Sequence, residues 1–281
     1  MSRRLRGIAN DNAQIVAEGG YVAHDGTSVT IGPVLAAAIS GTVDHAPDEP
    51  IDLPAPAGRH TVFEVTGEDS LRAARRLHLE GAEHIAVLDF ASARNPGGGY
   101  LNGAKAQEED LCRNALLYPC LLAAPGYYAA HRSSADLLYS DRVIWSPGVP
   151  VHRDDQGRLS PELYQVSFLT CPAPNAGQVL RRDPDAGERI RLTLHRRAGR
   201  LLAVAARHGA RELVLGAWGC GVFRNDPRDV AGAFRVHLAD SGAFSSVFDR
   251  VVFAVLDRSD ESTTRGAFTD CFASMLSTAA P

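Results

Sequence analysis

The chain has 281 residues, 45% of them hydrophobic, which is enough to bury a substantial core in one large domain or two smaller ones. A net charge of −4 excludes the extended basic surface with which proteins bind nucleic acid along its length, so no direct nucleic-acid partner is expected. No apolar run reaches the length of a membrane span, and residues 1–7 lack the apolar run of a signal peptide, which predicts a cytoplasmic protein without a membrane partner.

Cysteine and histidine give no sign of a metal or disulfide framework. The five cysteines are scattered without a CxxC pair, and the ten histidines form neither an HxH nor an HExxH pattern. We therefore expect reduced cysteines, no metal site and no redox cofactor.

The first 58 residues are predicted to form an accessory helical segment. Residues 5–18 and 33–40 have the pattern of amphipathic helices, and a Pro/Asp-rich linker follows at 46–58. A larger domain is expected over residues 59–281. It begins with a strand at 61–65, a helix at 69–80 and an apolar strand at 85–88.

A glycine triplet and a run of amide and acidic residues follow the strand at 85–88. Asp89 ends the apolar run, Gly97, Gly98 and Gly99 come next, and Gln107-Glu108-Glu109 stands at the beginning of a stretch, 104–122, with helical spacing of its apolar residues. Glycines allow positive φ and a backbone nest that can bind an anion such as phosphate. Each half alone has a structural explanation, as a turn and as acidic residues that complement a helix dipole, but together they indicate a substrate site.

Strands and helices continue to alternate to the end of the chain. Strands are expected at 142–145 and 165–170, then, after a breaker-rich stretch at 171–187, a helix at 188–208, a strand at 213–215, a helix at 227–240 and a strand at 251–256. This alternation predicts an α/β fold with a mixed, mostly parallel sheet and helices on both faces. Ligands of such sheets bind at the carboxyl ends of strands.

A second glycine loop follows the strand at 213–215. Gly219 and Gly221 allow another anion-binding nest, and Phe223 offers an apolar face for a ribose or base, unless its ring belongs to the core. Cys220 lies inside this loop, where a small side chain explains it better than a nucleophile does.

These residues resemble a known family. Asp89-Phe90-Ala91, the glycine triplet and Gln107-Glu108-Glu109 are similar to the signature of bacterial-type poly(ADP-ribose) glycohydrolases, which are built on a macrodomain, and the loop after residue 216 resembles the macrodomain's diphosphate-binding loop. The resemblance implies that 59–281 is a macrodomain-like catalytic domain whose partners are poly(ADP-ribose) or ADP-ribose and ADP-ribosylated proteins, with no cofactor.

The resemblance also implies roles for individual residues. Glu109 would be the acid/base, Glu108 would hold the ribose hydroxyls, and Asp89 would help to orient the ribose. Asn95 would share that task, although Ser92 could replace it. The other substrate-binding residues implied are Gly97, Gly98, Gly99, Gln107, Ala217, Trp218, Gly219, Cys220, Gly221, Val222 and Phe223.

Two further functions stay open. The protein could be a reader that binds ADP-ribose without cleaving it, or a hydrolase of mono-ADP-ribosylated protein or of a small ADP-ribose ester. Two carboxylates beside a bound diphosphate would only add repulsion in a reader, which favours an enzyme. The absence of a basic surface predicts that polymer is shortened from its ends with ADP-ribose as the main product.

Overall fold

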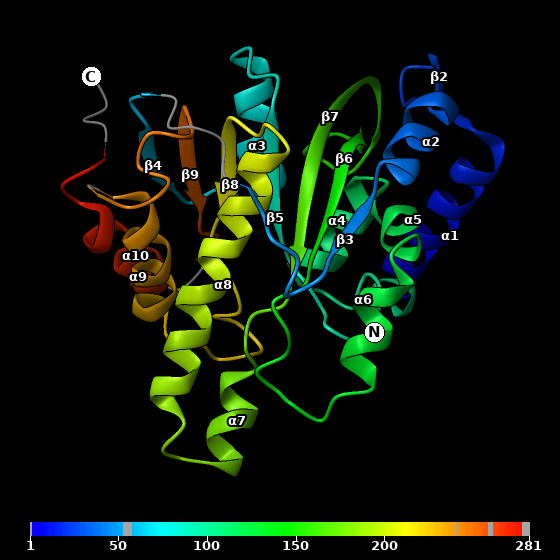
Figure 1. Ribbon diagram of the computed structural model, residues 1–281. Coiled ribbons are helices and arrows are strands. Elements are labelled where there is room, and N and C mark those ends of the chain that lie inside the picture. Colours follow the sequence, from blue (N-terminus) through cyan, green and yellow to red (C-terminus); the bar gives the residue numbers. More distant parts are fainter. Residues whose placement is uncertain (1, 53–57, 240, 258–260, 277–281) are drawn as a thin grey trace. The chain divides into compact units, whose positions relative to one another are not determined.

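The computed structural model describes residues 2–52, 58–239, 241–257 and 261–276. Within these ranges the elements (Figure 1) are α1 (Arg3–Glu18), β1 (Gly20–Val22), β2 (Ser28–Thr30), α2 (Gly32–Ser40), β3 (Val43–His45), β4 (Val62–Thr66), α3 (Ser70–Leu79), β5 (Ile85–Phe90), the 3-10 helix η1 (Tyr100–Asn102), α4 (Gln107–Asn114), α5 (Leu117–Leu122), α6 (Pro125–Arg132), β6 (Val143–Arg153), β7 (Leu159–Cys171), α7 (Ala176–Arg182), α8 (Gly187–Arg207), β8 (Glu212–Leu215), α9 (Pro227–Leu238), β9 (Arg250–Ala254) and α10 (Thr263–Phe272). None of these helices is long and apolar enough to cross a membrane.

The chain packs into two units that are interleaved in sequence. The first unit takes residues 1–45, 89–134 and 142–171, and the second takes 46–88, 135–141 and 172–281. The N-terminal helices therefore belong to the same unit as the glycine triplet and the Gln-Glu-Glu run. The expected domain boundary after residue 58 stays a prediction.

The strands have the order β3-β6-β7-β5-β8-β9-β4 in a seven-stranded sheet, and β1 pairs with β2 in a separate small sheet. In the second unit β8 runs parallel to β5 and to β9, and β9 runs parallel to β4. In the first unit β3 is antiparallel to β6, and β6 is antiparallel to β7. The prediction of a mixed α/β fold with a largely parallel sheet is confirmed.

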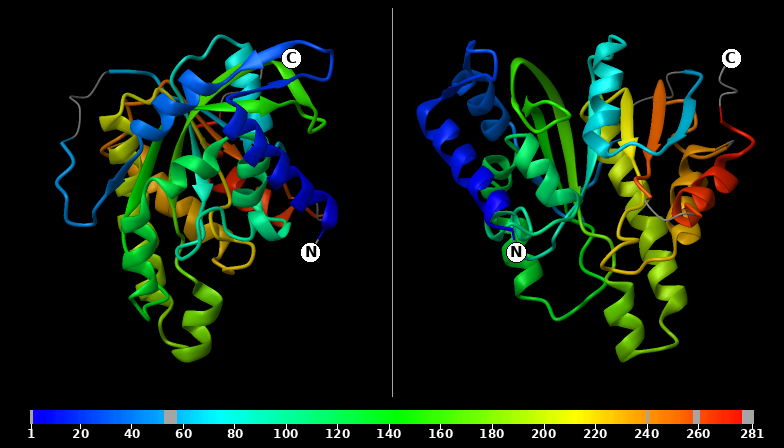
Figure 2. Two further views of the ribbon diagram at one scale, coloured as in Figure 1. Left: turned by 90° about the vertical axis from the view of Figure 1, so that its right-hand side faces the viewer. Right: turned by 180° about the vertical axis from the view of Figure 1, so that it is seen from behind.

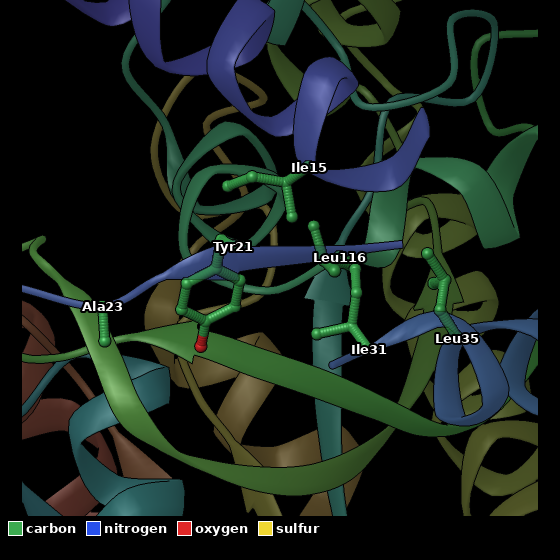
Figure 3. Packing of buried hydrophobic residues seen from close by; sticks show 6 residues of the cluster. All are labelled: Ile15, Tyr21, Ala23, Ile31, Leu35 and Leu116. Atoms are coloured by element: carbon green, nitrogen blue, oxygen red, sulfur yellow. The ribbon is translucent and has the colours of Figure 1, made fainter. Parts of the chain in front are cut away.

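The first unit is held together by a hydrophobic cluster between the N-terminal elements and the β6–β7 pair. Figure 3 shows the buried residues of this cluster, which are Ile15, Tyr21, Ala23, Ile31, Leu35 and Leu116. The hydroxyl of Tyr21 points toward the strands and donates a 2.7 Å hydrogen bond to the carbonyl of Ser160. Such a buried ring adds about 2 kcal/mol of hydrophobic stabilisation and also satisfies its polar atom.

The second unit combines the parallel strands with long helices. In Figures 1 and 2, α8 and α9 lie side by side, and they make many contacts with each other. Helix α9 begins as its sequence predicts, because the Asp226 side chain accepts a hydrogen bond from Arg228 N and Pro227 occupies the first helical turn. The loop between β8 and α9 therefore ends at a well-defined helix start.

Several sequence predictions need correction. The strands expected at 142–145 and 165–170 extend over Val143–Arg153 and Leu159–Cys171, and the N-terminal segment that was expected to be helical also contains β1, β2 and β3. The stretch 104–122 was expected to be one helix, but α4 and α5 are separate, because Ala115 is extended (φ −116°, ψ 153°) and the N–H of Leu116 donates to the carbonyl of Pro150 in β6. Pairing with a strand has overridden the helical spacing of the apolar residues. The breaker-rich stretch at 171–187 contains α7, whose first turn is capped by the Asn175 side chain.

Candidate active site

Asp89 lies at the end of β5 and is completely buried. Its Oδ2 accepts a 2.9 Å hydrogen bond from the hydroxyl of Thr170 in β7. Burial raises the pKa of Asp89 to about 7; the Thr170 hydrogen bond opposes this shift and the Glu109 carboxylate adds to it. A buried carboxyl that can hold its proton near neutral pH is an uncommon feature of a structural core and marks a candidate site.

The glycine triplet forms two successive turns after this strand. Gly98 N donates to the carbonyl of Asn95 at 2.9 Å, and both Gly97 (φ 65°) and Gly98 (φ 57°) are in the left-handed region. A Cβ atom placed on Gly98 would lie 2.5 Å from Oε1 of Glu109 and 3.0 Å from Oε2 of Glu108. Both carboxylates therefore lie over the same side of Gly98, and only glycine leaves room for them.

Backbone N–H groups of the strand end and the loop fix the three side chains at the start of α4. Phe90 N donates to Oε1 of Gln107 at 2.8 Å. Ser92 N donates to Oε2 of Glu108 at 2.7 Å, and Gly99 N donates to Oε1 of Glu109 at 2.8 Å. The position of Gln107 to Glu109 in the first turn of a helix was predicted correctly, and the hydrogen bonds explain why this run follows the triplet.

Each carboxyl group of the cluster keeps one oxygen atom without a hydrogen-bond partner within the described part of the chain. These buried atoms are Oδ1 of Asp89, Oε1 of Glu108 and Oε2 of Glu109. Burial and the charge of Asp89 raise the pKa of Glu108 well above its usual value. Unpaired buried oxygens cost free energy and are rare, so three of them on neighbouring acidic side chains indicate a functional site rather than a core.

Two tyrosines that the sequence analysis did not single out lie near the acidic cluster. Tyr127 and Tyr128 in α6 are fully buried, and their rings pack edge to face at 4.8 Å between centroids. Burial, followed by the charge of Glu108, raises the pKa of Tyr128, so its phenol stays protonated. The sequence pattern around Tyr127 and Tyr128 is the same as that of ordinary core residues, so it could not identify them as part of a site.

The second glycine loop begins where β8 ends in the second unit. Gly219 has φ 72°, and a Cβ atom there would lie 2.3 Å from Cβ of Ala173 and 2.6 Å from Nδ2 of Asn225. The buried Asn225 amide holds this loop by donating to the carbonyls of Gly219 and Pro174 at 3.1 and 2.8 Å. The backbone of the loop is thus fixed by contacts within the second unit.

Four N–H groups of the loop remain available, whereas those of Trp218 and Cys220 donate to carbonyls of the same loop. Among the residues that the structure describes, no acceptor takes the N–H of Gly219, Gly221, Val222 or Phe223. A Cβ atom on Gly221 would meet nothing within 4 Å, and Val222 is 84% exposed. Several free N–H groups in an open glycine-rich turn are what an anion-binding nest requires.

The side chains of this loop divide into buried and accessible ones. Trp218 is fully buried and its ring lies 6.2 Å from that of Phe234, so its indole belongs to the core. Burial raises the pKa of Cys220 to about 12, which leaves almost no thiolate and supports the structural interpretation of that cysteine. Phe223 is half-buried, with its ring 6.0 Å from the ring of Tyr139.

Tyr139 is a second aromatic candidate that the sequence analysis missed. It has a left-handed backbone (φ 61°), which is uncommon for a residue with a bulky side chain and is often found at functional sites. The fully buried guanidinium of Arg197 donates to the carbonyls of Leu138 and Tyr139 at 2.8 and 3.1 Å. The strained backbone of Tyr139 is thus held by a buried arginine.

Comparison with known proteins identifies the family. A family model described as the catalytic domain of microbial-type PARG, poly(ADP-ribose) glycohydrolase, matches residues 9–154, more than half of the chain. The chain belongs to this family. Curated protein sequences gave no match.

Solved structures of glycohydrolases of this family are similar to this chain. The poly(ADP-ribose) glycohydrolase of Thermomonospora curvata is 45% identical, with a TM-score of 0.89, over 96% of this chain and 100% of that chain. A structure of that enzyme bound to the inhibitor ADP-HPD is 46% identical, with a TM-score of 0.88, over 96% of this chain and 99% of that one. The Deinococcus radiodurans enzyme in complex with ADP-ribose is 48% identical, with a TM-score of 0.80, over 86% of this chain and 98% of that chain.

In this microbial-type PARG, the N–H groups of the glycine triplet, which were predicted to bind a phosphate, are bonded to other groups of the protein. Gly98 N donates to Asn95 O, Gly99 N donates to Glu109, and the backbone of Gly97 is hydrogen-bonded to Glu108, so all three glycines are engaged inside the protein. Asn95 is exposed, and its N–H donates to the hydroxyl of Ser92 at 3.2 Å. Contact of either Asn95 or Ser92 with a ribose stays a prediction.

No set of three or more His, Cys, Asp or Glu side chains in the described ranges could hold a metal ion. The titratable groups gathered at the candidate site are the carboxyl groups of Asp89, Glu108 and Glu109.

Proposed function

We propose that this protein hydrolyses the ribose–ribose O-glycosidic bonds of poly(ADP-ribose) and releases ADP-ribose. The observation that carries the proposal is the arrangement of Glu108 and Glu109, each of which has one oxygen fixed by a backbone N–H and one buried oxygen without a partner. A fixed carboxyl group with a free oxygen is prepared for proton transfer or for hydrogen bonding to a sugar hydroxyl. Membership of a glycohydrolase family supports the same reaction.

Glu109 is assigned the acid/base role. Its carboxyl group donates a proton to the oxygen of the leaving ribose while the bond from that oxygen to the anomeric carbon breaks, and the positive charge spreads over the ring of the other ribose as an oxocarbenium-like state. Water then adds to the anomeric carbon and returns a proton to the Glu109 carboxylate. One side chain completes both steps, because Gly99 N holds Oε1 and leaves Oε2 for the proton.

Glu108 and Asp89 have supporting roles in this proposal. The unpaired Oε1 of Glu108 binds ribose hydroxyls of the unit that is released. Asp89 is completely buried and hydrogen-bonded to Thr170, so we assign it an indirect effect on the ribose, through its electrostatic interaction with Glu108 and Glu109.

The loop at 217–223 is assigned the diphosphate. Its four free N–H groups and the nest formed around Gly219 suit a diphosphate, and the half-buried ring of Phe223 suits the adjoining ribose. The Deinococcus enzyme was solved with ADP-ribose and the Thermomonospora enzyme with ADP-HPD, which supports an ADP-ribose unit as the ligand of this chain.

Incubation of the purified protein with poly(ADP-ribose), followed by chromatography of the products, tests the proposal. We expect ADP-ribose as the main product from the first time points, with chains shortened from their ends. Binding of ADP-ribose in calorimetry with no shortening of polymer would support the reader instead. Release from mono-ADP-ribosylated protein with intact polymer would support the third function.

We also propose that the protein works in the cytoplasm. The described helices include none that could cross a membrane, which is consistent with that location. Microscopy of a fluorescent fusion in the native cell tests it, and an envelope-bound signal would contradict it.

A further inference from the structure

Helix α1 contacts the segment that carries the acidic cluster at two separate points. At its start, the N–H of Ser2 donates to the carbonyl of Gly103 at 3.4 Å. A Cβ atom on Gly103 would lie only 2.6 Å from the Ser2 carbonyl oxygen, so the backbones are in close contact. The second point is the side chain of Asn12, in the middle of α1, which is 3% exposed.

The amide nitrogen of Asn12 faces three acceptors of this segment. It donates to the hydroxyl of Tyr100 at 3.1 Å and to the carbonyls of Cys112 and Arg113 at 3.2 and 3.0 Å. Both carbonyls are in the last turn of α4, which ends where Ala115 becomes extended. The last carbonyls of a helix have no partner within the helix, so Asn12 satisfies groups that would otherwise need water.

The amide oxygen of Asn12 is used as fully as the nitrogen. It accepts hydrogen bonds from Nε2 of His152 and from Nη2 of Arg153, both at 3.0 Å. Burial, followed by the charge of Arg153, lowers the pKa of His152 to about 3, so its ring is neutral and donates through Nε2–H. No other common side chain of this size donates on one side and accepts on the other, so these contacts require asparagine here.

The contacts of Asn12 connect to Glu109 from two directions. Tyr100 directly follows Gly99, whose N–H holds Oε1 of Glu109, and Cys112 and Arg113 end the helix on which Glu109 stands. We propose that Asn12 is a positioning residue for Glu109, which fixes the glycine loop and α4 relative to each other and so fixes the acid/base. This inference rests on the proposed function and gives the N-terminal helix a part in catalysis.

The expected effect comes from geometry, because a misplacement of about 1 Å at a reacting group can lower turnover about a hundredfold. In Asn12→Ala, we expect kcat on poly(ADP-ribose) to fall at least about tenfold while the dissociation constant for ADP-ribose changes by less than about threefold. Asn12→Asp keeps the acceptor for His152 and Arg153 but loses the donors. The kcat of Asn12→Asp should therefore fall as far as that of Asn12→Ala, whereas its melting temperature should fall less.

Two variants in the same helix are matched controls. Asn10→Ala changes an exposed asparagine and should leave kcat and stability unchanged. Ile15→Ala removes a buried side chain of the cluster in Figure 3, whose members are all hydrophobic residues. It should lower the melting temperature at least as much as Asn12→Ala but leave kcat within about threefold of the parent.

A double-mutant cycle with Tyr100→Phe completes the test. Tyr100→Phe removes one acceptor of Asn12, should lower kcat by itself, and should add little to Asn12→Ala, because both changes release the same loop. Equal kcat losses in Asn12→Ala and Ile15→Ala, or multiplying effects of Asn12→Ala and Tyr100→Phe, would overturn the inference. If Asn12→Ala does not fold, Asn12→Asp and Tyr100→Phe decide by the same comparison. A parent protein that does not cleave polymer would overturn the proposed function instead, whereas an active parent with unaffected variants would overturn only the role of Asn12.

Discussion

Two glycine-rich loops follow strands in this protein, and they differ in whether their backbone N–H groups are already hydrogen-bonded within the protein. In the loop of the first unit, Gly98 N and Gly99 N donate to Asn95 and to the Glu109 carboxylate. In the loop of the second unit, the N–H groups of Gly219 and Gly221 meet no acceptor within the ranges that the structure covers. Loops of similar composition therefore differ: the first binds a carboxylate of the protein itself, and the second has N–H donors that are available to the diphosphate we propose.

The two loops also differ in whether a glycine can be replaced by a residue with a side chain. A Cβ on Gly98 would collide with both carboxylates, whereas a Cβ on Gly221 would meet nothing within 4 Å. Glycine is required at position 98 because the carboxylates of Glu108 and Glu109 lie against it. At position 221 the absence of a side chain leaves the backbone N–H groups open to a ligand.

Glu109→Gln should have the largest effect. Glutamine keeps the carbonyl oxygen that accepts from Gly99 N but cannot donate an acidic proton, so turnover should fall by about 10²–10⁴-fold. ADP-ribose affinity in calorimetry should stay within a few-fold. Glu108→Gln should also lower turnover, by misplacing the ribose. Parental turnover in Glu109→Gln would remove this residue from the acid/base role.

Gly98→Ala should cost about a hundredfold in turnover, because the new methyl group must displace Glu108 or Glu109 and the left-handed backbone becomes strained. The matched change, Gly221→Ala, should leave stability within about 0.5 kcal/mol of the parent, because its methyl group meets no protein atom within 4 Å. It should lower turnover less than Gly98→Ala does, because it narrows the approach to the N–H groups without displacing a carboxylate. Steady-state kinetics and thermal unfolding measure both variants. A larger turnover loss in Gly221→Ala than in Gly98→Ala would reverse the roles assigned to the two loops.

Phe223→Ala should lower turnover at least tenfold with little change in melting temperature, because loss of an aromatic contact can amount to about 3 kcal/mol. The half-buried position of the ring beside Tyr139 fits a face that a ligand completes. Normal turnover with a large loss of stability would show that the ring serves the core.

Asp89→Asn should have the smallest effect, seen in the pH dependence of stability. The folded pKa of Asp89, about 7, lies above its unfolded value of about 3.9, so its contribution to stability is fully present below pH about 4 and is lost as pH rises through 7. Asparagine keeps an acceptor for Thr170 without the charge. The variant should therefore melt a few degrees above the parent at pH 8, and the difference should disappear near pH 4. A difference that is constant with pH would mean that Asp89 is not protonated by burial.

The sequence predicted those parts of the site that depend on local pattern. Asp89 at a strand end and Gln107 to Glu109 in a first helical turn follow from the apolar run and the helical spacing around them. The break at Ala115 could not be predicted in this way, because it results from pairing with β6, which is distant in sequence. Long-range hydrogen bonds leave no periodic trace.

The same limit explains the residues that were missed. Asn12 stands in an ordinary amphipathic helix, and its five partners come from three other segments. Tyr139 was not singled out because its left-handed backbone depends on Arg197, a residue 58 positions away along the chain. The sequence shows that both loops are rich in glycine, but only the folded backbone shows which of their N–H groups are already hydrogen-bonded.

A titration with inorganic diphosphate, followed by the amide resonances of the ¹⁵N-labelled protein, tests the contrast between the loops most directly. If the second loop is the anion site, the resonances of Gly219, Gly221, Val222 and Phe223 will shift together in a saturable way, because their N–H groups are free to bind the anion. The resonances of Gly98 and Gly99, whose N–H groups already bind Asn95 and Glu109, will stay in place. Shifts at Gly98 and Gly99 with none at Gly219 to Phe223 would contradict the account.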